Sequence, residues 1–151
     1  GKYGIRKRNE IYSQELTGDI SNYKVITKNT LVIGMGSSQI DIGILLDDKT
    51  FAVSPAYSTF KIVGVDASFL KELLTHLNKK LSVLYMITGA RQGKSINKKD
   101  FLKHKLQLPN AGEQRRIADF LFAINQLIES RQQQVNHLRQ WKRGLMQKMF
   151  V

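Results

Sequence analysis

Side chains able to contact nucleic acid gather in three short stretches of this sequence. Arginine and glutamine can bond a base edge through two hydrogen bonds, whereas lysine, serine and backbone N–H groups mostly hold phosphates. The stretches RKRN (6–9), GSSQ (36–39) and ARQGKSINKK (90–99) supply these residue types. Ordinary solvated loops have similar compositions, so the group is a stronger signal than any one residue. The candidate DNA-binding residues are Arg6, Lys7, Arg8, Ser37, Gln39, Arg91, Gln92, Lys94 and Lys98.

Motifs for catalysis are incomplete. GMGSSQ (34–39) lacks the third glycine and the Lys-Ser or Lys-Thr pair of phosphate-binding loops, which favours a turn between strands. SPAY (54–57) resembles the catalytic tetrapeptide of amino-methyltransferases but lacks the leading Asn or Asp and the second Pro. No set of Ser, His and Asp indicates nucleophilic catalysis. We therefore predict no catalytic residues and a chain that is not an enzyme.

Potential metal ligands are scattered along the chain. Asp47 and Asp48 are adjacent in a predicted hairpin turn, so their carboxylates need not converge on an ion. His76, His104 and His137 are far apart and lack ligand spacing. The chain has no cysteine, which excludes disulfides and thiolate zinc sites and is compatible with a reducing cytoplasm. We predict neither a metal site nor a cofactor.

The charge is strongly positive and unevenly distributed. The chain has 24 Lys and Arg against 12 Asp and Glu, a net charge of +12, and the excess is largest in residues 61–112. Such an excess favours a polyanionic partner, because phosphate contacts release condensed counterions. Nucleic acid is the first interpretation, and an acidic protein partner is the alternative. The longest apolar runs, such as residues 81–87, are too short to span a bilayer, so we expect a cytoplasmic protein with no membrane partner.

The elements that must position these side chains are short strands followed by helices. Strands rich in β-branched and aromatic residues are predicted at 23–27, 31–33, 42–46, 51–53 and 57–63. Asp66 is the expected N-cap of a helix from Ala67 to about Leu77. The apolar segment 81–87 fits either a second helix or a strand, and residues 88–100 are predicted to form a polar loop. The predicted fold is α+β.

A long helix is predicted for residues 110–151. Asn110 and Glu113 fit a capping box at its start. Apolar residues then recur at alternating spacings of four and three, which is typical of a coiled coil, with Arg131 and Lys142 as the two interruptions. The helix would be about 57 Å long at roughly 1.5 Å per residue, against about 26–30 Å for the remaining domain. Its expected pairing residues are Ile117, Leu121, Ile124, Ile128, Val135, Leu138, Leu145 and Met149.

The stretch from Gly89 to Gln132 resembles the specificity subunits of type I restriction–modification systems. The matching residues include Gly89, Gln92 and the pairs Ser95-Ile96, Leu108-Pro109, Glu113-Gln114 and Ile117-Ala118, with the basic Arg116 between the last two pairs. The strand stretches SNYKVI (21–26) and VSPAYSTF (53–60) are also similar to this family's recognition domains. The chain departs from the family pattern at PNAG (109–112), where a second proline is more usual.

This resemblance implies a DNA target recognition domain at 1–109, lacking its N-terminal segment, and a spacer or dimerisation helix at 110–151. It implies recognition of one half of a bipartite double-stranded DNA site, with methyltransferase and restriction subunits as partners. The helix would pair with a second copy or with a second spacer helix of the same subunit. The chain would be a fragment, an isolated domain or a half-size subunit. The alternative is a basic assembly protein that dimerises through its C-terminal helix.

Overall fold

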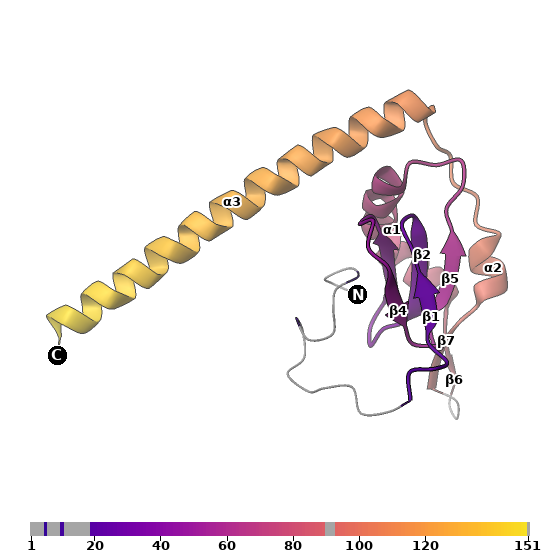
Figure 1. Cartoon of the computed structure of the whole chain (residues 1–151), viewed down its shortest axis with the longest axis horizontal. Coiled ribbons are helices and arrows are strands. Elements are labelled where there is room, and N and C mark those ends of the chain that lie inside the picture. The colour runs from indigo at the N-terminus through magenta and orange to yellow at the C-terminus, as the bar shows by residue number, and fades with distance from the viewer. Residues whose placement is uncertain (1–4, 6–9, 11–18, 90–92, 151) are drawn as a thin grey trace.

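The computed structural model describes residues 5, 10, 19–89 and 93–150. These residues form a small α+β head, here residues 19–109 without the undescribed positions, and one long helix that projects from it (Figure 1). The predicted α+β class is confirmed. The predicted projection of the long helix is confirmed as well, because most of its length extends beyond the head.

The centre of the head is an antiparallel sheet of three strands. β2 (Thr30–Met35) lies between β3 (Ile40–Leu45) and β5 (Ser58–Lys61). β1 (Lys24–Ile26) and β4 (Phe51–Val53) pair as a separate antiparallel ribbon. These strands fall within or next to the predicted stretches, with ends shifted by one or two residues.

Both faces of the β2–β3 hairpin are buried, which explains its nearly continuous apolar sequence. Ile33, Ile40 and Ile44 face the helix α1 (Ala67–Tyr85). Val32 and Leu45 point the other way and pack with Ile26 of β1. Since successive side chains of a strand alternate between faces, the two clusters use alternate residues of the same strands.

Helix α1 begins as predicted and ends later. The Asp66 carboxylate accepts a hydrogen bond from the Phe69 N–H at 2.9 Å, which confirms the cap. The helix continues to Tyr85 instead of ending near Leu77, because Asn78 and Ser82 turn their polar groups toward the sheet and Leu81 is buried. The ambiguous segment 81–87 is therefore divided between α1 and the strand that follows it.

The prediction of a polar loop at residues 88–100 is wrong. Strands β6 (Met86–Gly89) and β7 (Gly93–Ile96) pair as a hairpin, and α2 (Lys98–Leu102) follows. Asn97 caps α2 by accepting from the Asp100 N–H at 3.3 Å, and Phe101 is buried against the core. Met86, Ile96 and Phe101 pack against the core and anchor the described parts of this stretch.

Helix α3 (Ala111–Met149) begins after Asn110, whose side chain accepts from the Glu113 N–H at 3.0 Å. Only its first turns contact the head. Within α3, the buried residues are Gln114 and Ala118, both near its start. From Phe122 to the end of the helix all residues are exposed except Gly144, which is half-buried.

Candidate nucleic-acid interface

A tight turn at Gly36 to Gln39 joins β2 to β3 at one end of the head. The Gly36 N–H donates to the Gln39 carbonyl at 3.1 Å, and the side chains of Ser37, Ser38 and Gln39 are exposed. A Cβ on Gly36 would lie 2.4 Å from the Gln39 carbonyl oxygen, so the turn can close this tightly only with glycine there. The turn therefore presents three polar side chains on a closed backbone.

Two side chains of α1 hold the strand that leaves this turn. The Ile40 N–H donates to the Ser82 hydroxyl at 2.9 Å, and the Asn78 amide donates to the Ile40 carbonyl at 3.0 Å. The Ser82 hydroxyl in turn donates to the Asn78 side-chain oxygen at 3.2 Å. The three bonds form a closed ring, which we call the Ile40 clamp, around a residue that is 1% exposed. The clamp fixes the backbone next to Gln39.

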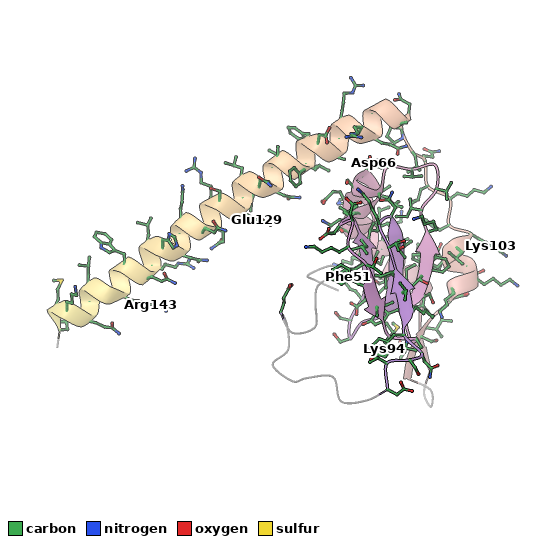
Figure 2. All side chains as sticks on the ribbon, viewed as in Figure 1. Phe51, Asp66, Lys94, Lys103, Glu129 and Arg143 are labelled. Atoms are coloured by element: carbon green, nitrogen blue, oxygen red, sulfur yellow. The ribbon has the colours of Figure 1, made fainter. Side chains whose placement is uncertain are left out.

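The β6–β7 hairpin lies beside the turn. Lys94 of β7 donates from its ammonium group to the Ser37 carbonyl, although the two residues are far apart in sequence. The Lys94 side chain is exposed at the end of the head, where Figure 2 labels it. The structure thus brings together the candidates Ser37, Gln39 and Lys94, which come from two separate stretches.

The other candidates are placed differently. Lys98 is the first residue of α2 and is exposed, and no bond joins it to the turn among the residues that the structure describes. Five candidates lie outside the described residues: Arg6, Lys7, Arg8, Arg91 and Gln92. DNA contact by any of the candidate residues stays a prediction.

Some of the basic charge serves the fold instead. Lys24 donates to the carbonyls of Pro55 and Tyr57, at 3.0 and 2.6 Å. Lys28 pairs with Asp48 at 2.8 Å, and Lys61 donates to the Lys28 carbonyl at 2.9 Å. These lysines hold nearby loops in place, and Lys24 and Lys61 keep their charge because a backbone carbonyl does not neutralise an ammonium group.

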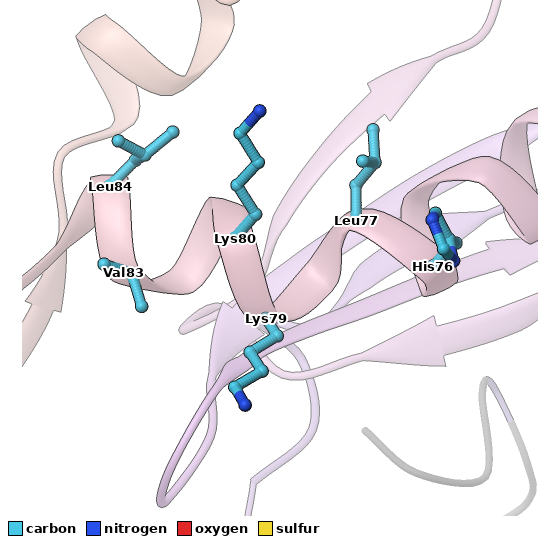
Figure 3. A pocket seen from close by; sticks show the side chains of 6 residues that line it. All are labelled: His76, Leu77, Lys79, Lys80, Val83 and Leu84. Atoms are coloured by element: carbon cyan, nitrogen blue, oxygen red, sulfur yellow. The ribbon is translucent and has the colours of Figure 1, made fainter.

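A shallow hollow of about 480 Å³ follows one face of α1. Figure 3 shows its lining residues His76, Leu77, Lys79, Lys80, Val83 and Leu84, all of which come from this one helix. The hollow combines two lysines with apolar side chains, of which Val83 is 79% exposed. The hollow is open to solvent and is not an enclosed substrate site.

The predicted pairing residues of α3 have no partner within the described part of the chain beyond its first turns. Ile117 and Leu121 are half-buried and line an apolar notch of about 190 Å³ with Phe69 and Leu73 of α1. The exposed members of the stripe are Ile124, Ile128, Val135, Leu138, Leu145 and Met149.

The described residues contain no cluster of three or more His, Asp or Glu side chains that could hold a metal ion. None of the helices among them is long and apolar enough to cross a membrane.

Comparison with known proteins identifies the family. Residues 1–140 match the type I restriction modification DNA specificity domain. A curated protein of Methanocaldococcus jannaschii, described as the specificity subunit of the type I restriction enzyme MjaX, is 31% identical over 87 residues. That match covers 58% of this chain and 20% of the relative, so the chain spans a minor part of the relative's length. No solved structure matches. The match over residues 1–140 shows that this chain belongs to the type I restriction modification DNA specificity domain family.

Proposed function

We propose that this chain recognises one half of a bipartite double-stranded DNA site, as a specificity subunit or as part of one. In this role it positions methyltransferase and restriction subunits on the DNA and catalyses no reaction itself. The observation that carries the proposal is the contact between the Ser37 carbonyl and Lys94, which joins the Gly36–Gln39 turn to the β6–β7 hairpin. We call these two segments together the reading surface.

The chemistry of the reading surface fits a DNA groove. The major groove admits a two-stranded β-ribbon, and the β6–β7 hairpin is such a ribbon, with the exposed Gly36–Gln39 turn beside it. Gln39 carries the amide that can bond adenine with both of its polar atoms, while Ser37 and Lys94 suit phosphate oxygens. Because the Ile40 clamp fixes the strand next to the turn, the turn loses little conformational entropy when it binds DNA.

The exposed stripe of α3 supports pairing with a second copy of the helix. In a parallel pair in register, Arg131 would face Arg131 and Lys142 would face Lys142 across the seam, which is repulsive. In an antiparallel pair with Ile117 opposite Met149, the same spacing places Arg131 opposite Val135 and Lys142 opposite Ile124. The seam charges therefore favour the antiparallel pair, with one head at each end of a spacer about 58 Å long at about 1.5 Å per residue.

The α1 hollow supports a second candidate function. His76, Lys79 and Lys80 beside exposed Val83 and Leu84 would fit an acidic protein, as expected of a basic assembly factor. In that case DNA binding would be weak and indifferent to sequence.

Selection from a pool of random double-stranded DNA distinguishes the two functions. We expect the chain to enrich one short motif, because specific protein–DNA contacts typically favour the cognate site over others by about 10³ or more. Recovery of unrelated sequences, with binding that disappears at moderate salt, would favour the assembly factor.

A further inference from the structure

One buried side-chain amide bonds α3 to the head. Gln114 lies in the first turns of α3 and is 5% exposed. Its side-chain oxygen accepts from the Asp66 N–H at 3.0 Å, and its NH₂ group donates to the Pro109 carbonyl at 2.8 Å. Asp66 is the N-cap of α1, so Gln114 bonds α3 to the start of α1 and to the segment that leads into α3.

Among glutamine, glutamate and methionine, which have similar lengths, only glutamine satisfies both partners. Its amide is acceptor and donor at once, whereas a glutamate at this site lacks the donor and a methionine lacks both. Asparagine is one methylene shorter. The sequence pattern does not predict this role, because a glutamine in a polar first turn of a helix is usually solvated.

The other contacts at the joint do little to fix the direction of α3. Ile117 and Leu121 meet Phe69 and Leu73 around the notch of about 190 Å³, which Glu72 and His76 also line. Apolar contacts do not depend strongly on direction, and the remaining space lets the two helices shift. The two hydrogen bonds of Gln114 are the directional contacts at this joint.

We propose that Gln114 is a positioning residue that fixes the angle at which α3 leaves the head. Helix α3 is a long lever: a change of about 10° at the joint moves the far end of a 58 Å helix by about 10 Å. In a paired assembly this displacement would shift one head relative to the other by at most about three base pairs, when it runs along the DNA at about 3.4 Å per base pair. The statement about the angle is independent of function, and the statement about DNA rests on the function proposed above.

A pair of spin labels measures the angle directly. The chain has no cysteine, so labels at Lys49→Cys in the head and Gln133→Cys in α3 have no background. Labelled protein is mixed with a large excess of unlabelled protein, so that distances within one chain dominate. Pulsed electron resonance then gives the distance distribution for wild type, for Gln114→Met and for Gln114→Glu. The matched control is Gln126→Met, a substitution at an exposed position of the same helix.

We expect both Gln114 variants to widen or shift the distribution by several ångströms, while the control superimposes on wild type. Circular dichroism checks that the helices persist, and Gln114→Glu serves if Gln114→Met does not fold, since it keeps the acceptor for Asp66. A folded Gln114 variant with the wild-type distribution overturns the proposal.

A DNA measurement tests the second statement. Paired sites that differ only in half-site spacing should show one preferred spacing for wild type and a broadened preference for the Gln114 variants, with single half-site affinity unchanged. An unchanged spacing preference with altered label distances overturns only the DNA statement. If neither wild type nor the variants bind DNA, the proposed function fails, while the label distances still test the statement about the angle.

Discussion

Removing the hydroxyl of Ser82 should destabilise the head measurably. Ser82 is 4% exposed and accepts from the Ile40 N–H at 2.9 Å. Ser82→Ala leaves that buried N–H without an acceptor and leaves the Asn78 side-chain oxygen without its donor. A buried polar group without a partner costs about 1–3 kcal/mol, so we expect the free energy of unfolding to fall by about that amount.

Urea denaturation followed by circular dichroism measures this loss, and Thr75→Ala is its control. Thr75 is on the same helix, but its hydroxyl donates to the Lys71 carbonyl at 2.7 Å in an exposed position. Surface substitutions of this kind usually change stability by less than about 0.5 kcal/mol. Because both variants gain the helix propensity of alanine, their difference isolates the clamp. Equal stability of Ser82→Ala and Thr75→Ala would refute the reasoning.

Two further predictions concern DNA binding and pairing. Lys94→Ala should weaken DNA binding and reduce the slope of log affinity against log salt by about one, as measured by fluorescence anisotropy. The control Lys49→Ala, in the turn beyond β3, should leave the slope unchanged. An unchanged slope for Lys94→Ala excludes a phosphate contact by Lys94. The double substitution Ile124→Asp and Leu138→Asp should give a monomer by light scattering. Phe122→Asp, at an exposed position outside the stripe, should leave the dimer intact. A dimer for the double variant as well as for Phe122→Asp places the interface elsewhere.

The elements with a strong local pattern could be predicted from sequence. The apolar strands of the β2–β3 hairpin and the Asp66 and Asn110 caps have short-range causes, namely side-chain periodicity and side-chain capping bonds. The length of α3 is likewise predictable, because the apolar stripe resumes after each interruption and no proline occurs within it.

The β6–β7 hairpin and the end of α1 could not be predicted, because long-range contacts decide them. Lys94 and its neighbours are polar and resemble a loop, but Met86 and Ile96 at the base of the hairpin pack against the core. The predicted end of α1 near Leu77 is wrong because the Asn78 amide bonds the backbone of Ile40, 38 residues earlier in the chain. Local polarity cannot reveal a partner that distant.

The candidate site could be predicted only in part, because contacts between distant residues assemble it. Composition singled out Ser37, Gln39 and Lys94, but only the fold brings Lys94 to the turn. The supporting residues Asn78 and Ser82 were missed, and a polar pair spaced by four on an otherwise apolar helix face was the available signal.

Reading of DNA bases by the Gly36–Gln39 turn is the core of the proposed function. Parallel selections from a random DNA pool with wild type and with Gln39→Ala test it most directly. We predict that wild type enriches one motif and that Gln39→Ala keeps the motif but loses preference at one base pair, since a bidentate contact contributes about 1–3 kcal/mol of discrimination. The same motif with unchanged preference at every position would contradict reading by Gln39, and the absence of any motif from wild type would contradict sequence recognition itself.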